Sequence, residues 1–467
     1  MLAVLVLAYL GVSLALGLYA ASRLGGAEDF AVAGKRFGVP VVTAAVFATW
    51  LGAENVLGIP AAFMKDGLRG VVADPFAAMA CLVLVGLAYA RPMHRLRGVT
   101  LGDFFRERFD RGTEIALSLA IAFSYVGWVA AQLVALGLVM SVLSGGAIDT
   151  RTGTLLGAAV VLAYTVAGGM LSVAITDFLQ AAVIVGGMGY VAWVVAGLAG
   201  GVAPVLASAS AAGRFAFLPE PDAAAILAWI NAALLIVFGS VPQQDVLQRV
   251  KSARTEGGAV VATIAGGLLY FAIACVPIFL VSAAALVDPP LVARGLAGDP
   301  QRILPTLLLE RTPLAVQALF FGALVSAILS TAGGALLAPA VLVAENVVRP
   351  LVRPATDRGV LWTMRLTVLG FGVAVTAMAL ASHRSIYDLV NESGKVVLVA
   401  AFVPLTAGLF WRGATARGAR WAIAAGLVAW LAAEALAPDA AVPPPLLGLG
   451  ASFLGLLAGS RAPFRSP

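Results

Sequence analysis

Residues 47–60 read FATWLGAENVLGIP and interrupt a strongly apolar run. Glu54 and Asn55 stand side by side there, with two glycines and Pro60 close by, and glycine and proline disfavour a regular helix. If the run crosses a bilayer, its broken backbone must line a cavity or bind something, because unpaired carbonyl and amide groups are costly in hydrocarbon. Freed carbonyls suit a hard cation, and the amino end of a half-helix suits an anionic group. The stretch therefore predicts a broken helix beside a binding cavity.

The composition is that of an integral membrane protein. Of the 467 residues, 61% are hydrophobic and 12% are charged, and the mean hydropathy is +0.99. Soluble domains are about 45–50% apolar and about 25% charged. Apolar stretches long enough to cross a bilayer as helices recur along the whole chain, without the short alternating segments of a membrane barrel. We expect an all-α protein with about thirteen transmembrane helices, at 1–22, 38–63, 71–90, 113–143, 154–169, 174–199, 223–248, 257–287, 313–346, 361–381, 386–411, 416–436 and 445–460.

The basic residues indicate the orientation. Most of the 30 lysines and arginines fall in loops on one side of the membrane if the spans alternate from an outer amino terminus. Cytoplasmic loops carry such an excess. We therefore expect a multi-pass protein of a bacterial inner membrane, with its amino terminus outside and its carboxyl terminus in the cytoplasm. The net charge of +6 is then a topology signal, and we expect membrane lipid but no nucleic acid as a partner.

A second interrupted span lies five spans later. Residues 238–245 read FGSVPQQD, with Gly239 and Pro242 inside an apolar run. An odd offset reverses the direction in which the chain crosses the membrane. Paired interrupted helices in corresponding halves of a chain indicate a transporter built from inverted repeats. The alternative reading is that Gly and Pro are simply frequent in membrane helices.

Polar residues inside the spans are candidates for function. Glu54 is the most deeply placed acid, whereas Asp74 and Asp177 lie near predicted span ends, where charge costs less. Ser330 and Thr331 are adjacent hydroxyls, and Ala327 lies one turn before Ser330, so one helix face offers a carbonyl and a hydroxyl pair to an ion. The structural alternatives are that Glu54 binds an amide of the broken helix and that the hydroxyls bind carbonyls of their own helix.

Four blocks resemble the sodium/solute symporter family, in that family's order. Residues 164–180, YTVAGGMLSVAITDFLQ, are similar to its signature, and the other blocks are SVPQQDVLQRVKSAR, FGALVSAILSTAGGALLAP and FVPLTAGLFWRGATARGA. The resemblance covers nearly the whole chain. It implies the leucine-transporter-type fold with two inverted five-helix repeats, here 38–199 and 223–411. One extra helix, 1–22, would precede them and two, within 416–460, would follow. The function implied is sodium-coupled import of a small organic solute by alternating access.

The resemblance also implies a sodium site between the second and ninth spans. Sodium is the coupling ion, and its ligands would be three backbone carbonyls and two hydroxyls, those of Ala48, Leu51, Ala327, Ser330 and Thr331. Asp177, inside the signature, would lie on the cytoplasmic route of ion release.

The family's solute site lies beside the break in the second span. Here that region would contain Trp50, Glu54, Asn55, Trp128, Gln132, Gln243 and Gln244. Trp50 and Trp128 match aromatic positions that the choline-transporter branch places around a quaternary ammonium, and two tryptophans near a carboxylate can hold a cation through their ring faces. Gln243 stands where that branch has a further aromatic, and GAEN is similar to the sugar-transporter branch. We therefore expect a small organic solute, cationic or zwitterionic, carried by a monomer or weak homodimer.

Other functions fit the sequence less well. A channel needs a continuous pore, usually from repeated subunits. An enzyme needs a reactive cluster, but His94 and His383 fall in separate predicted loops, and Cys81 and Cys275 read as packing residues within apolar spans, which implies neither a disulfide nor a metal site. A transporter-like membrane sensor and a proton-coupled transporter that uses Glu54 remain alternatives.

Overall fold

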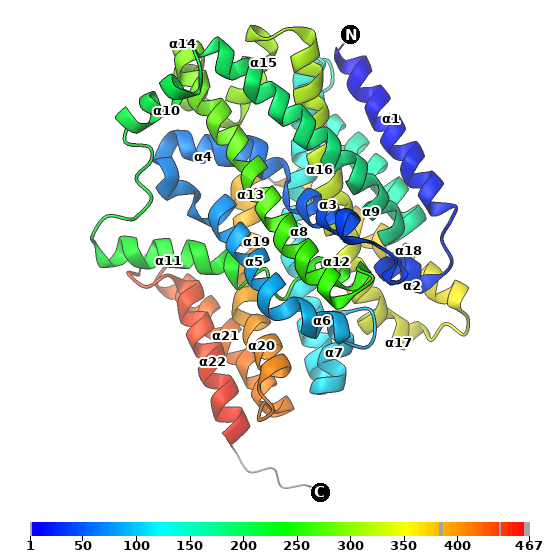
Figure 1. Cartoon of the computed structure of the whole chain (residues 1–467). Helices are drawn as coiled ribbons and strands as arrows, with labels where there is room; N and C mark the ends of the chain where they lie inside the picture. The colour runs from blue at the N-terminus through cyan, green and yellow to red at the C-terminus, as the bar shows by residue number, and fades with distance from the viewer. Residues whose placement is uncertain (1, 383–385, 439, 462–467) are drawn as a thin grey trace, which may run out of the picture.

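The structure is a computed structural model that describes residues 2–382, 386–438 and 440–461, and all of its regular elements are helices. His383 lies outside the described residues. The chain runs from α1 at one end of the molecule to α22 at the opposite end (Figure 1).

The elements follow in chain order. The first part contains α1 Leu2–Ala21, α2 Ala27–Val32, η1 Ala33–Lys35, α3 Val39–Trp50, η2 Glu54–Gly58, α4 Ile59–Asp66, η3 Gly67–Val71, η4 Val72–Ala77, α5 Ala78–Leu84, η5 Val85–Tyr89, α6 Ala90–Arg95, α7 Leu101–Arg108, α8 Arg111–Leu143, α9 Thr150–Leu198 and α10 Val202–Ala211. The second contains α11 Ala223–Val237, α12 Gln244–Ser252, α13 Glu256–Val287, α14 Pro289–Ala297, η6 Pro300–Arg302, α15 Ile303–Arg311, α16 Leu314–Val343, η7 Ala344–Val348, α17 Arg349–Val352, α18 Asp357–Ala381, α19 Ile386–Ala400, α20 Phe402–Phe410, α21 Ala416–Leu436 and α22 Pro444–Arg461.

The long helices begin where a short polar side chain can cap them. Asp110 accepts from the amide of Thr113 at 2.8 Å at the start of α8, and Thr255 and Thr356 act in the same way for α13 and α18. A free amino end of a helix needs such an acceptor. The polar loops between apolar runs therefore set where each membrane helix starts.

By length and composition, eight helical stretches among the described residues can cross a membrane, and further apolar helices, such as Val39–Trp50 and Ala223–Val237, are shorter. Two of the eight each join two predicted spans. Glu54–Arg95 includes the end of 38–63 and all of 71–90, and Thr150–Leu198 includes both 154–169 and 174–199. The predicted number of thirteen is therefore not confirmed, because a kinked helix and a broken helix are counted differently from the hydrophobic runs that form them.

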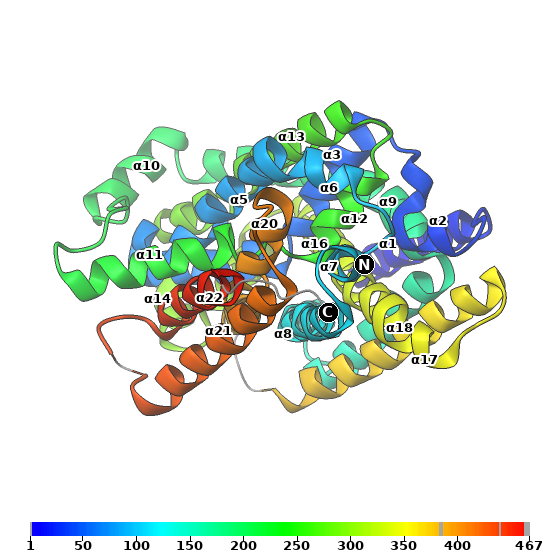
Figure 2. The same ribbon diagram turned by 90° about the horizontal axis from the view of Figure 1, so that it is seen from below.

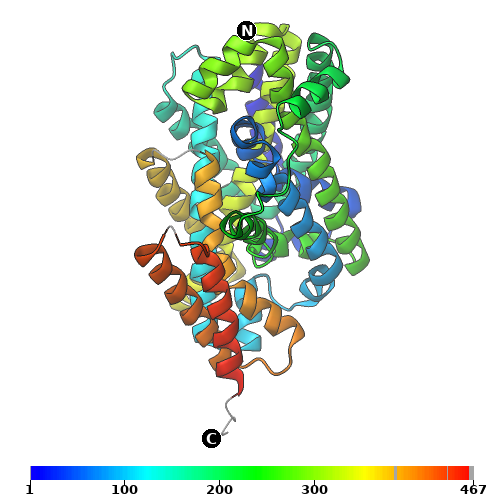
Figure 3. The same cartoon turned by 90° about the vertical axis from the view of Figure 1, so that its left-hand side faces the viewer.

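The helix α16 forms the centre of the bundle. Seen from below, it lies among α8, α9, α12 and α18 (Figure 2). In the most apolar window of the stretch Leu314–Val352, 94% of the residues are buried. A helix that is apolar on all sides is typical of a position surrounded by other helices. The carboxyl-terminal pair α21 and α22 lies on the flank of the bundle, where the two helices pack on each other (Figure 3).

The two interrupted helices are broken where the sequence predicts. The first leaves helical geometry at Leu51, with φ −91° and ψ 88°, and the second is interrupted between Val237 and Gln244. Gly239 lies in the second break, where an added Cβ would stand 3.2 Å from the carbonyl oxygen of Gly394 on α19. At its far end α12 is joined to the segment before α3, since the amide of Phe37 donates to the carbonyl of Ser252 at 3.1 Å.

The kink in α9 gives a testable prediction about stability. Gly169 has φ +54°, and a Cβ there would stand 2.5 Å from the carbonyl oxygen of Phe30. We expect Gly169→Ala to destabilise the protein by about 2–4 kcal/mol through backbone strain and overpacking, measured as a lower melting temperature in detergent. Gly186→Ala, in the same helix with nothing within 4 Å of its Cβ, is the matched control. Equal melting temperatures for the two variants would contradict the prediction.

Candidate functional site

The break in the first helix is held open by two side-chain caps. The amide of Gly52 donates to Asn55 Oδ1 at 2.8 Å, and the amide of Ala53 donates to Gln132 Oε1 at 2.9 Å. These acceptors satisfy the amino end of the half-helix that starts with η2. At the opposite end, the last turn of α3 has free carbonyls: the carbonyl of Ala48 loses its helical donor, because the amide of Gly52 donates to Asn55 instead.

Glu54 is buried and bound at both carboxylate oxygens. Trp128 Nε1 donates to Oε1 at 3.1 Å, and Gln132 Nε2 donates to Oε2 at 2.8 Å. Gln132 thus bridges the carboxylate and the amide of Ala53, and it is itself fully buried. Both donors come from α8, so the predicted residues Glu54, Trp128 and Gln132 are brought together.

A second carboxylate lies beside the first. Asn55 Nδ2 donates to Asp74 Oδ2 at 3.2 Å and contacts the hydroxyl oxygen of Tyr270 at 2.7 Å, and the Tyr270 hydroxyl donates to Asp74 Oδ1. The sequence placed Asp74 near a span end, and nothing in it singled out Tyr270. The only sequence signal was an acid followed by Pro75 at the edge of an apolar run, and its partner is 196 residues away.

The two acids, Glu54 and Asp74, border a cavity of about 50 Å³ at the break, enough for one or two water molecules. Its lining is mostly apolar and aromatic and comes from Trp50, Glu54, Asp74, Ala78, Trp128, Ile236, Ser240, Gln243, Val390 and Gly394. None of the described residues that line it is basic. The cavity must widen to admit an organic solute.

Three of the seven residues predicted for the solute do not line this cavity. Asn55 and Gln132 lie behind it and hold the broken backbone. Gln244 faces away, because its Oε1 accepts from the amide of Leu101 at 2.9 Å and its Nε2 donates to the carbonyl of Val99 at 3.1 Å. As the first residue of α12, Gln244 points to the segment before α7.

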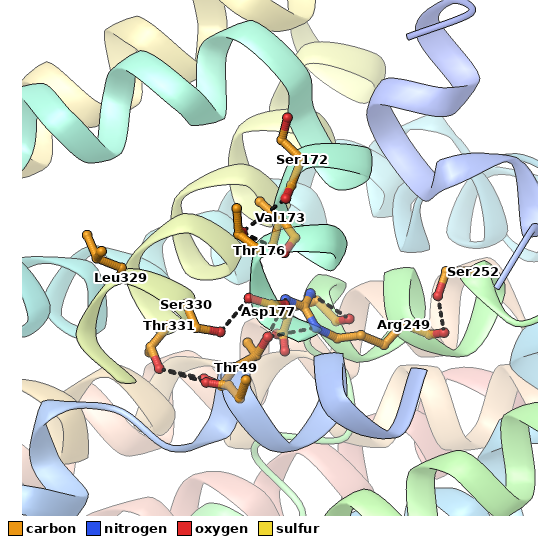
Figure 4. Close-up of polar contacts among 12 residues, drawn as sticks. Thr49, Ser172, Val173, Thr176, Asp177, Arg249, Ser252, Leu329, Ser330 and Thr331 are labelled. Carbon is orange, nitrogen blue, oxygen red and sulfur yellow. Dashed lines mark hydrogen bonds and ion pairs between the residues drawn. The ribbon is translucent and has the colours of Figure 1, made fainter. Parts of the chain in front are cut away.

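One hydroxyl of the pair on α16, that of Thr331, meets the end of α3 (Figure 4). The hydroxyl of Thr331 donates to the carbonyl of Thr49 at 2.9 Å and lies 3.5 Å from the carbonyl oxygen of Ala48. Ala327 is buried on the same helix, one turn before the pair. The two helices that were expected to share an ion therefore touch through oxygen atoms at this point.

Asp177 and Arg249 complete this cluster. Ser330 Oγ donates to Asp177 Oδ1 at 2.5 Å, and Arg249 Nη2 lies 4.0 Å from Asp177 Oδ2 (Figure 4). Arg249, 1% exposed, also donates from Nε to the hydroxyl of Thr49 at 3.0 Å. Its guanidinium fills the space beside Gly334, where an added Cβ would stand 2.4 Å from Nη2. In the sequence, Arg249 counted only among the basic residues of the loops, so its contacts with Asp177 and Thr49 were not predicted.

Residues 30–426 match the model of the sodium:solute symporter family. The chain belongs to this family. It is 29% identical over 435 residues to the high affinity choline transporter 1 of Homo sapiens, and the aligned region covers 89% of this chain and 73% of the choline transporter. It is 28% identical over 404 residues to the sodium/iodide cotransporter of Homo sapiens, covering 79% of this chain and 59% of that one.

The solved structure of a Na⁺-coupled sialic acid symporter matches the fold with a TM-score of 0.84 at 19% identity, over 98% of each chain. The predicted all-helical, leucine-transporter-type fold is thereby confirmed. As a member of this family the chain is a multi-pass membrane transporter, not an enzyme, and its function is sodium-coupled symport of a small solute.

Proposed function

We propose that this member of the family carries a small cationic organic solute into the cell together with sodium, through the cavity beside Glu54. One observation carries the choice of a cation: the cavity has two carboxylates, Glu54 and Asp74, and no basic residue among its described lining. Trp50 and Trp128 also line it, and tryptophan faces attract cations. The resemblance to a choline transporter supports the same solute class.

Within this proposal, sodium binds where α3 and α16 meet. The ligands are the carbonyls of Ala48, Leu51 and Ala327 and the hydroxyls of Ser330 and Thr331. The contact of Thr331 with the end of α3 supports this set, because a hydroxyl and carbonyls already converge there. Neutral oxygens suit a hard monovalent cation. Asp177 receives the ion on its way to the cytoplasm, which its hydrogen bond from Ser330 supports.

Transport then follows from differential binding. Sodium between α3 and α16 and the solute beside the same break both stabilise one conformation of the broken helix over another. Each sodium that enters along a potential of 100 mV contributes about 2.3 kcal/mol to solute uptake. In this arrangement residues 38–199 and 223–411 form the inverted repeats, preceded by 1–22 and followed by the helices within 416–460. The protein works as a monomer or weak homodimer in a bacterial inner membrane, with its amino terminus outside and its carboxyl terminus in the cytoplasm.

A ligand screen tests the solute class. The melting temperature of the purified protein is measured with choline, a betaine, neutral amino acids, sugars and short carboxylates, each in sodium and in potassium. We expect a rise with a quaternary ammonium or amine, and only in sodium. Stabilisation by a zwitterion or an anion alone would reject the cationic solute, and equal uptake in sodium and potassium at fixed pH would favour proton coupling through Glu54.

Replacing Glu54 with glutamine tests the site itself. We expect Glu54→Gln to raise the solute concentration for half-maximal uptake by about 10-fold or more, because a buried charge that faces the solute is lost. The sodium dependence should change less than two-fold. Glu310→Gln, an exposed acid on α15, is the control. A larger change in sodium than in solute dependence would assign Glu54 to the ion instead.

A further inference from the structure

The amino-terminal helix α1 lies outside the two repeats but reaches the central helix (Figure 1). It packs along α9, where Ser172 Oγ donates to the carbonyl of Gly17 at 2.5 Å, and it touches α16 near the middle of its own length. A helix that only filled space against lipid would need no polar contact with α16.

Tyr9 makes that polar contact. Its hydroxyl oxygen lies 2.5 Å from Ser326 Oγ, and Ser326 Oγ in turn lies 2.7 Å from the carbonyl of Gly322, to which it donates. Because the hydroxyl of Ser326 donates its proton to the carbonyl of Gly322, the hydroxyl of Tyr9 is the donor in the contact with Ser326. Ser326 precedes Ala327 and lies one turn before Ser330, so the contact is made next to the proposed sodium ligands.

A second tyrosine holds the next turn of α16. The Tyr164 hydroxyl donates to the carbonyl of Leu329 at 2.6 Å, and Leu329 immediately precedes Ser330. The hydroxyl can approach because residue 333 is glycine: a Cβ there would stand 2.5 Å from it. The other side of Tyr164 rests on α1, where a Cβ on Gly17 would stand 3.1 Å from that of Tyr164.

We propose that α1 positions the sodium-binding turn of α16, directly through Tyr9 and indirectly through Tyr164. Both tyrosines are positioning residues, since they touch the helix backbone or Ser326 and not the ion. The reason is geometric. Most contacts of α16 are apolar and allow the helix to shift slightly along its axis, whereas directed hydrogen bonds fix its axial position. Supporting hydrogen bonds of this kind control how well ligand oxygens are oriented toward an ion. The inference rests on the sodium site of the proposed function.

The test is the sodium dependence of uptake in Tyr9→Phe, which keeps the ring and removes the hydroxyl. We expect the sodium concentration for half-maximal uptake to rise about three- to ten-fold, the loss of one buried hydrogen bond. The maximal rate and the solute dependence at saturating sodium should change less than two-fold. Tyr19→Phe is the matched control on the same helix, because Tyr19 is 56% exposed and, among the described hydrogen bonds, its hydroxyl accepts only from Arg23. A fall in rate without a change in sodium dependence would overturn the inference.

Ser326→Ala supplies the partner of a double-mutant cycle. If the two side chains act as one contact, the double variant with Tyr9→Phe shifts the sodium dependence no further than the larger single change. Additive shifts would overturn the pairing. Ser330→Ala, measured in the same assay, separates the two proposals. If it leaves the sodium dependence unchanged, the sodium site itself is misplaced. If it shifts the dependence and Tyr9→Phe does not, only the role of α1 is rejected.

Discussion

Alanine at Ser330 or Thr331 is expected to raise the sodium concentration for half-maximal transport by about 10- to 100-fold. Each change removes one oxygen from a small set, and an interaction between a polar group and a charge contributes about 1.5–3 kcal/mol. Thr331→Ala carries a further loss, since its hydroxyl also ties α16 to the carbonyl of Thr49. The measurement is initial uptake over a range of sodium at constant ionic strength and fixed solute.

Two companion variants make this result specific. Thr331→Ser keeps the hydroxyl and should retain most of the sodium affinity. Ser282→Ala removes a buried hydroxyl of α13 that donates to the carbonyl of Ile278 within its own helix at 2.8 Å, and it should have no effect on sodium. Half-saturation values within two-fold of the parent protein for both Ser330→Ala and Thr331→Ala would move the ion to another place.

The second large effect concerns Arg249. We expect Arg249→Met to lower the melting temperature by about 10 °C, because the Asp177 carboxylate then loses its nearest cation while it stays fully buried, and breaking a buried pair costs about 3–5 kcal/mol. The methionine also leaves the hydroxyl of Thr49 without the guanidinium donors. Thermal unfolding of the purified variant in detergent measures the loss.

A second-site change identifies the cause. Asp177→Asn combined with Arg249→Met should recover at least half of the lost stability, since the buried Asp177 carboxylate that Arg249 faces is then neutral. Lys251→Met is the control on the same helix: Lys251 binds only the neutral carbonyls of Leu96 and Gly98 among the described residues, so its loss should cost less. A double variant as unstable as Arg249→Met would show that packing of the guanidinium, and not its charge, is what matters.

The breaks at Leu51 and Gly239 were predictable because they depend on residues that act locally. Glycine, proline and an acid close together in an apolar run favour a broken membrane helix, because glycine and proline are poor helix formers and an acid is costly in hydrocarbon. The same holds for Ser330 and Thr331, whose spacing from Ala327 is a property of one helix. The family resemblance placed these local features in a shared fold, which the similarity to the sialic acid symporter confirms.

The direction of individual side chains was less predictable. Gln243 and Gln244 are neighbours in the sequence, yet only Gln243 lines the cavity, because α12 begins between them and each helical residue turns about 100° from the last. For the same reason Asn55 and Gln132 hold the broken backbone while Glu54 borders the space. Polarity within a span signals a site, but it does not say which polar residue faces the solute.

The sequence by itself determined that this chain spans a membrane, where its helices break, and which polar residues the breaks contain, since hydrophobic length and backbone propensity are local properties. Only the tertiary structure decided that Tyr270 joins Asp74, that Arg249 lies beside Asp177, and that Tyr9 of α1 reaches Ser326. Those partners are separated by 72 to 317 residues, and their contacts depend on how whole helices are rotated and stacked against one another.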